Sequence, residues 1–376
     1  MKINYYLLIF AFLLCSCSSI TLREGLYINE KDDWLQIGRD LGKSYTADTG
    51  SALNPPFTMF WNFNAESGFP KNSISVSDGV LFAGCLNGDV FAVDMKNGGN
   101  AGKVFTKAKS GFSTPVILKK IIVMAFSGGE YNYMTGYDFT KGVFKWKKTI
   151  DRIESSPVAK NDEIFFATLK GRIFKIDSKD GGKIWSKSFD FPFFNSPSIS
   201  NDILYIGDSR GTMYAVDINS GDIKWNFKTG GGIYSDVSVF RDKIFFGSDD
   251  KNFYCLDTSG NLMWKKNLET KFMSSCTFYS GNVISAGING KIFSLNINTG
   301  DEVWEYTTNA TVTATPVLHG DKIFVGSFDK TFYCLDAKNG EVLWKYEFDE
   351  RIKTSAVVWK NYILVACDDK HIYCFK

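Results

Sequence analysis

Histidine is scarce in this chain: only His319 and His371 occur among its 376 residues. This excludes most His-based catalytic triads and the zinc sites that are built on paired imidazoles. The sequence also has no Cys-x-x-Cys motif and no vicinal Cys-Cys pair, so a zinc or redox-active cysteine motif is not expected. We interpret both histidines as exposed turn residues.

Charge of one sign is also missing. Lys and Arg together number 43 against 41 for Asp and Glu, and no Lys/Arg-rich run occurs. There is therefore no electrostatic case for a nucleic-acid partner. A phosphate-binding loop is not found either, because the glycine run of "TGGGIY" (229–234) joins two strand-like segments and no helix follows it.

No hydrophobic run is long enough for a transmembrane helix. The apolar stretch at residues 5–14 follows Lys2 and is typical of a secretory signal peptide. It ends in "LLCSC" (13–17), which resembles a bacterial lipobox, so we expect a signal peptide over residues 1–16 and lipidation of Cys17. The alternative is an ordinary secretory signal with incidental cysteines. Residues 17–54 then form a tether and a lead-in segment.

The chain is rich in internal repetition. An Asp or Asn that closes a strand-like segment recurs at steps of 39 to 44 residues, at Asp94, Asp138, Asp177, Asp217, Asp257, Asn296 and Asp336. A Trp follows at steps of 39 or 40 residues, at Trp146, Trp185, Trp225, Trp264, Trp304 and Trp344. A fixed period of this size predicts a repeat architecture.

Each repeat contains four short strand-like runs separated by turn residues. In one repeat these runs are residues 313–318, 322–327, 331–336 and 341–346, which we label strands A to D. Four β-branched and aromatic runs per repeat of about 40 residues predict a blade of a β-propeller. The fold class is therefore all-β, with four-stranded antiparallel blades over residues 55–376.

The repeated Asp, Gly and Trp have structural roles. An Asp side chain accepts backbone N–H groups in the turn between strands C and D, and the Gly adopts positive φ at low cost. The Trp is large and carries one N–H, which suits the gap between neighbouring blades. We therefore interpret the repetition as a scaffold, not as a set of active sites.

The number of blades follows from the chain ends. The last repeat stops at Lys376 without a strand D, whereas "FTMFWNF" (57–63) is a spare strand D near the N-terminus. Eight blades close if this N-terminal strand completes the C-terminal blade, and closure removes exposed sheet edges. The alternative, seven blades with ragged ends, leaves two orphan strands.

The pattern Asp-x-x-x-Gly-x-x-x-Trp, as in residues 217–225 and 336–344, resembles that of the PQQ-binding-like β-propeller repeat family. The resemblance implies one of two branches. Quinoprotein dehydrogenases bind pyrroloquinoline quinone and Ca²⁺ in the centre of the propeller. BamB-like lipoproteins have eight blades and no cofactor, and they are partners of the outer-membrane β-barrel assembly protein.

The residues favour the second branch. The quinoprotein branch usually has a vicinal Cys-Cys disulfide and long substrate-funnel loops, and this sequence lacks both. We expect a lipid-anchored, non-enzymatic scaffold without cofactor or metal, in the cell envelope and on the periplasmic side of the outer membrane. Two alternatives stay open: a quinoprotein-like dehydrogenase, and a ligand-binding or sensory propeller with a small molecule in its channel.

Six cysteines stand at repeat positions that small buried residues occupy in other blades: Cys85, Cys255, Cys276, Cys334, Cys367 and Cys374. We expect free buried thiols. The alternative is a disulfide between adjacent blades, Cys85 with Cys367 or Cys334 with Cys374.

Two links from a strand D to the next strand A carry unusual residues. Phe191, Phe193 and Phe194 cluster in one link, and Ile233 and Tyr234 lie in the following link. Exposed aromatic clusters mark contact surfaces, so these five residues are the predicted partner-binding site. The alternative is that they close the mouth of the channel and bind no partner.

Overall fold

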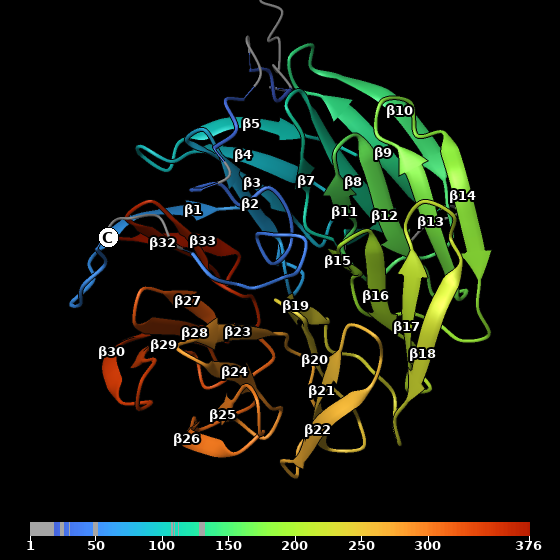
Figure 1. Cartoon of the computed structure of the whole chain (residues 1–376). Coiled ribbons are helices and arrows are strands. Elements are labelled where there is room, and N and C mark those ends of the chain that lie inside the picture. The colour runs from blue at the N-terminus through green and yellow to red at the C-terminus, as the bar shows by residue number, and fades with distance from the viewer. Residues whose placement is uncertain are drawn as a thin grey trace, which may run out of the picture.

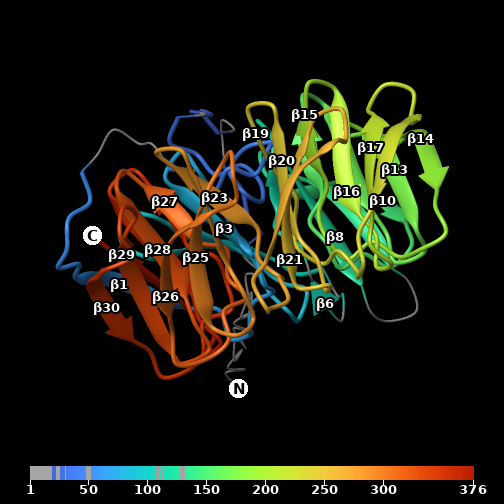
Figure 2. The ribbon, with the colours of Figure 1, turned by 60° about the horizontal axis from the view of Figure 1, so that its bottom comes forward.

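The computed structural model describes residues 19–22, 26–29, 31–47, 52–106, 108, 110–111, 113–127 and 132–376. These residues form an all-β ring of eight antiparallel sheets, shown in Figure 1, and this confirms the predicted eight-bladed propeller. Seven sheets have four strands, and the sheet within residues 110–149 has five because two short strands pair with the same neighbour. In Figure 2 the strands run between two loop-bearing faces. No helix among the described residues is long and apolar enough to cross a membrane.

The strands follow the chain around the ring. Blades 1 to 4 contain β2 (Ile74–Ser77), β3 (Val80–Gly84), β4 (Val90–Asp94), β5 (Asn100–Val104); β6 (Ser110–Gly111), β7 (Val116–Ile117), β8 (Ile121–Ser127), β9 (Tyr133–Asp138), β10 (Val143–Thr149); β11 (Val158–Lys160), β12 (Glu163–Ala167), β13 (Arg172–Asp177), β14 (Lys183–Ser188); and β15 (Ser198–Ser200), β16 (Ile203–Gly207), β17 (Thr212–Asp217), β18 (Ile223–Lys228).

Blades 5 to 8 contain β19 (Ser238–Phe240), β20 (Lys243–Gly247), β21 (Asn252–Asp257), β22 (Leu262–Asn267); β23 (Cys276–Tyr279), β24 (Asn282–Ala286), β25 (Lys291–Asn296), β26 (Glu302–Thr307); β27 (Val317–His319), β28 (Lys322–Gly326), β29 (Thr331–Asp336), β30 (Val342–Glu347); and β31 (Val357–Trp359), β32 (Tyr362–Ala366), β33 (His371–Phe375), completed by β1 (Met59–Asn64).

The N-terminal strand closes the ring. Strand β1 pairs antiparallel with β33, with Trp61 opposite Cys374 and Asn64 opposite His371. This confirms the prediction for residues 57–63 and the count of eight blades. At the seam Trp344 packs against the rings of Phe57 and Phe375, with centroids 5.1 and 5.6 Å away.

The repeated Gly and Trp join neighbouring blades at six of the eight seams. Trp185 of blade 3 donates its indole N–H to the carbonyl of Ile218 in the turn of blade 4, at 2.9 Å. In that turn Gly221 has φ of 76°, and a Cβ there would lie 3.2 Å from the Trp185 ring. The same indole-to-carbonyl bond to the following blade is made by Trp61, Trp146, Trp225, Trp264 and Trp304. The repeated motif is therefore an interblade contact, as predicted.

The predicted strand at residues 313–318 begins too early. Strand β27 starts at Val317, because Pro316 has no N–H and the N–H of Thr315 donates to Ser355 of the next blade at 2.9 Å. The first half of the predicted strand thus bonds to a neighbouring blade instead of to strand B.

The interpretation of both histidines as exposed turn residues was wrong. His319 ends β27 and is only 5% exposed, because its Nδ1 lies 2.7 Å from the carbonyl oxygen of Ala47. His371 begins β33 and is partly buried opposite Asn64. The six cysteines of the described residues are buried free thiols.

Candidate functional site: plugged channel and link surface

Residues 33–47, which we call the plug segment, lie inside the ring and are drawn in dark blue in Figure 1. Their backbone bonds to the innermost strands of successive blades. Trp34 exchanges two backbone hydrogen bonds with Val76 of blade 1, at 2.8 and 2.9 Å. Carbonyl groups of the plug segment then accept the backbone N–H of one residue in each of blades 2, 4, 5 and 7: Ile117, Ile199, Val239 and Leu318.

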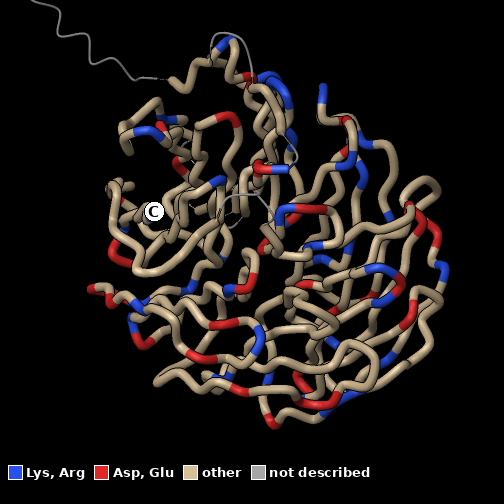
Figure 3. Tube along the Cα trace, turned by 60° about the vertical axis from the view of Figure 1, so that its left-hand side comes forward, with Lys and Arg blue, Asp and Glu red and all other residues tan. Residues whose placement is uncertain are grey.

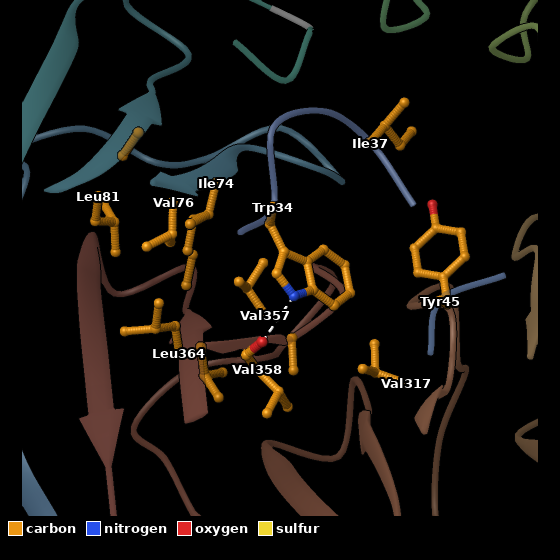
Figure 4. Close-up of a cluster of buried hydrophobic side chains, with 14 of the residues drawn as sticks. Trp34, Ile37, Tyr45, Ile74, Val76, Leu81, Val317, Val357, Val358 and Leu364 are labelled. Carbon is orange, nitrogen blue, oxygen red and sulfur yellow. Dashed lines mark hydrogen bonds between the residues drawn. The ribbon is translucent and has the colours of Figure 1, made fainter. Parts of the chain in front are cut away.

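Side chains complete the contacts with the remaining blades. The Gln36 side-chain oxygen accepts the N–H of Ala159 in blade 3 at 2.7 Å, and Thr277 of blade 6 donates its hydroxyl to the Tyr45 carbonyl. Trp34 donates its indole N–H to the Val358 carbonyl of blade 8 at 2.7 Å, as Figure 4 shows. The plug segment therefore contacts all eight blades.

A ring of small polar side chains lies at the start of the innermost strands. This hydroxyl ring consists of Ser73, Thr114, Ser156, Ser196, Asp236, Ser275, Thr315 and Ser355. Its members bond from blade to blade: the N–H of Ser156 donates to the Ser196 hydroxyl at 2.9 Å, and the N–H of Ser196 donates to the Asp236 carboxylate at 2.7 Å. Asp236 is the one carboxylate in a ring of hydroxyls.

Lys43 of the plug segment faces this carboxylate. Its Nζ lies 3.7 Å from Oδ1 of Asp236 and donates to the Ser196 carbonyl, and the Lys43 side chain is fully buried. Burial lowers the pKa of Lys43 to about 8, although the charge of Asp236 opposes the shift. Burial and the same carboxylate raise the pKa of Tyr45. The plug segment is thus fixed by a buried ion pair as well as by backbone bonds.

Two cavities of very different size lie beside the plug segment. A cavity of about 10 Å³ lies between Trp34, Tyr45 and Ser73, which is enough for roughly one water molecule. A wider open cleft of about 1120 Å³ lies on the plugged face, where Leu41, Phe240 and Phe278 meet Lys160 and Arg241. The small cavity has no room for a larger molecule, whereas the cleft, which nine residues of the plug segment line, is open to solvent.

The plugged channel does not fit a quinone with Ca²⁺. Calcium needs six to eight oxygen ligands, several of them carboxylates. The only carboxylate of the hydroxyl ring is engaged by Lys43 and the N–H of Ser196. Across the described part of the chain, no group of three or more His, Cys, Asp and Glu is placed to hold a metal ion.

On the opposite face, the two unusual links lie side by side, because the rings of Phe194 and Tyr234 are in contact at 5.4 Å. The predicted partner residues divide into two groups there. Phe193 and Ile233 are fully buried. They occupy a position that is buried and apolar in other blades too, as Ile153, Phe272, Val312 and Ile352 show at steps of 39 or 40 residues.

The other three residues reach the surface. Phe191 is 37% exposed, and the guanidinium of Arg210 lies 5.6 Å from its ring centroid. Phe194 and Tyr234 are partly exposed and directly precede the buried pairs Asn195–Ser196 and Ser235–Asp236. We call Phe191, Phe194 and Tyr234 the link surface. Partner binding by the five predicted residues stays a prediction, and Cys17 lies outside the described residues.

A family model described as the outer membrane protein assembly factor BamB matches residues 60–187, 135–247, 226–327 and 249–376. These overlapping matches cover almost the whole propeller. The chain belongs to the BamB family. No curated protein sequence gives a significant match.

Solved structures show the same fold. BamB from Moraxella catarrhalis is 17% identical, with a TM-score of 0.74 over 85% of this chain and 99% of that chain. A quinohemoprotein alcohol dehydrogenase from Comamonas testosteroni is 12% identical, with a TM-score of 0.79 over 93% of this chain and 81% of that chain. A europium-containing methanol dehydrogenase is 12% identical, with a TM-score of 0.76 and 90% coverage of both chains. At these identities the likeness establishes the fold alone.

Proposed function

We propose that this protein is a non-enzymatic scaffold that assists the assembly of outer-membrane β-barrel proteins by binding another protein of the assembly machinery. Membership of the BamB family is the observation that carries the proposal. The plug segment supports its non-enzymatic part, because it fills the centre of the propeller with side chains already bonded to the blades. A quinone-dependent dehydrogenase would need that space.

The scaffold is placed in the cell envelope by a lipid on Cys17, with the propeller in the periplasm and the lipid in the outer membrane. The lipobox-like sequence at residues 13–17 supports this anchor. Replacing Cys17 with Ala removes the acceptor, so the variant is expected to be unprocessed or soluble. A processed Cys17→Ala variant that still partitions into the detergent phase refutes the anchor.

The partner, for which we propose the outer-membrane β-barrel assembly protein, binds at the link surface. Phe191, Phe194 and Tyr234 offer aromatic area on neighbouring links, and the buried Phe193 and Ile233 hold these links against the ends of the blades. Rigid aromatic groups of this kind contribute strongly to protein interfaces, and the loss of a central one typically costs about 2 kcal/mol or more.

The experiment is a pull-down from detergent-solubilised membranes, with mass spectrometry of the co-purified proteins. The test variant carries Phe191→Ala, Phe194→Ala and Tyr234→Ala. The control carries Ile184→Ala, Ile223→Ala and Leu262→Ala, which truncate exposed residues on the outer strands of the same three blades. The test variant is expected to lose the assembly protein while the control retains it. Equal recovery with a folded test variant refutes the site, and absence of the assembly protein from the wild-type sample refutes the function.

A further inference from the structure

The first described residues are fixed to the outer wall of the propeller. Ile20 is fully buried between blades 1 and 2, and Tyr137 of β9 donates its hydroxyl to the Ile20 carbonyl at 3.0 Å. The N–H of Leu22 donates to the Phe139 carbonyl at 2.7 Å. Ser19 is exposed, and its side chain lies beside Gly142 in the turn before β10. The chain therefore leaves the propeller at the wall of blade 2.

This attachment leaves almost no tether. Cys17 is two residues before Ser19, and two extended residues span at most about 7 Å. A lipid on Cys17 would therefore hold the wall next to Ser19 at the surface of the bilayer.

The wall at this point is both apolar and basic. Val143 and Phe144 of β10 are 49% and 46% exposed, and the Phe144 ring packs edge-on against Tyr137, the residue that holds Ile20. Four exposed lysines surround this pair along the strand: Lys141, Lys145, Lys147 and Lys148. No Asp or Glu occurs in residues 139–150.

The combination is most pronounced on blade 2. The outer strand of blade 5 also has exposed Leu262 and Met263 and no Asp or Glu in residues 258–268, but it carries only two lysines, Lys265 and Lys266. The matching segment of blade 6, residues 299–308, carries Asp301, Glu302 and Glu305 and no lysine. Around the ring as a whole, basic and acidic positions are interspersed, as Figure 3 shows. Lysines next to exposed aromatic and aliphatic groups fit the anionic headgroups and the acyl boundary of a lipid surface.

We propose that the outer wall of blade 2, residues 141–149, lies against an anionic lipid surface. The proposal rests on the lipid anchor of the proposed function. Because the wall runs parallel to the ring axis, contact through the wall sets this axis along the membrane plane. Neither face of the propeller is then pressed against the bilayer, and the link surface stays accessible to a protein partner.

A fluorescence experiment on the acylated full-length protein in vesicles tests the proposal. An environment-sensitive probe is attached to Phe144→Cys or, as a control, to Leu262→Cys. Leu262 holds the matching place two residues after the turn glycine on the outer strand of blade 5, with 44% exposure. The six native thiols of the described residues are buried, so the new cysteine takes the label.

In vesicles that contain phosphatidylglycerol, nitroxide-labelled lipids are expected to quench the probe at position 144 several-fold more than the probe at position 262. Replacing the four lysines with Gln is expected to remove this difference, because each lysine near an anionic surface strengthens binding by about fivefold. Equal quenching at both positions, or quenching at neither, overturns the proposal.

The anchor and the wall contact fail in distinguishable ways. The mass of the mature protein shows whether Cys17 is acylated, and an unmodified mass refutes the anchor alone. Flotation of that unmodified mature chain with phosphatidylglycerol vesicles then tests the wall. Binding that is lost in the four-lysine variant supports the proposal, whereas absence of binding refutes it.

Discussion

Replacing Asp236 with Ser converts the one acidic member of the hydroxyl ring into the residue that other blades carry there. The backbone contact is expected to survive, because a Ser hydroxyl accepts the N–H of the preceding blade at Ser156 and Ser196. What changes is the electrostatic environment of Lys43, which stays fully buried and loses its counter-ion.

The magnitude follows from the pKa of Lys43. A native pKa near 8, against 10.5 in the unfolded chain, means that the buried ammonium group costs about 3 kcal/mol at neutral pH. A neutral Lys43 at pH 7 would cost about 5 kcal/mol relative to the unfolded chain. Because Lys43 can lose its proton, removing Asp236 destabilises the protein by no more than about 2 kcal/mol at pH 7, instead of the 3–5 kcal/mol typical of a broken buried pair.

The sign of the pH dependence is also fixed. Since the native pKa of Lys43 is below its unfolded value, the unfolded chain binds more protons between pH 8 and 10.5, and the Lys43 contribution to stability rises over that window. Above pH 8 the wild-type Lys43 is largely neutral and gains little from Asp236. The cost of Asp236→Ser should therefore fall towards zero at pH 9.

The assay is urea unfolding at pH 7 and pH 9, monitored by tryptophan fluorescence. It compares the wild type with Asp236→Ser, Lys43→Met and the double variant. The double variant replaces the buried pair without leaving a charge and should be more stable than the wild type by about 1–4 kcal/mol. A cost of Asp236→Ser above 3 kcal/mol that is equal at both pH values would refute this reasoning.

Three further predictions concern the scaffold. Gly260→Ala should lower the free energy of unfolding in urea by at least about 2 kcal/mol, because φ is 88° and the new Cβ would lie 2.7 Å from the Trp225 ring. The control Gly281→Ala, at φ 86° with open space around it, should lower it by only about 1 kcal/mol. Equal costs would contradict the interblade contact. Burial raises the pKa of each of the six thiols to about 12. Stability should therefore fall as the pH rises above 9, because the thiols of the unfolded chain ionise first. Ellman's reagent should react with these thiols only on unfolding, and rapid reaction of the native protein at pH 8 would contradict their burial. Deleting residues 57–64 should expose the edge of β33 and cause aggregation on size-exclusion chromatography, and an equally stable monomer would refute the closure by β1.

The period of about 40 residues made the propeller predictable, because each blade repeats the same four strands and the same Asp, Gly and Trp. The spare strand at residues 57–63 could be assigned because the last repeat lacks its own. The route of the plug segment could not be predicted, since its bonds are spread over all eight blades and the segment has no repeat of its own. His319 was misinterpreted for that reason: its partner is the carbonyl of Ala47.

Two features carried signals in the sequence. Ser156, Ser196 and Thr315 each precede a Pro, whereas Asp236 precedes Val237, so an alignment of the repeats singles out the acidic ring position. Phe193 and Ile233 looked irregular within their links. The apolar residues at the same register in other blades, such as Phe272 and Ile352, indicate a buried repeat position.

Site-specific photocrosslinking in living cells tests most directly the claim that the propeller acts by binding an assembly protein through its link surface. A photoreactive amino acid is placed at position 191, 194 or 234, and at the control positions 184, 223 and 262. Adducts with the outer-membrane β-barrel assembly protein are expected from the link positions and none from the controls. Adducts from the control positions alone, or no adduct with that protein from any link position, would contradict this claim.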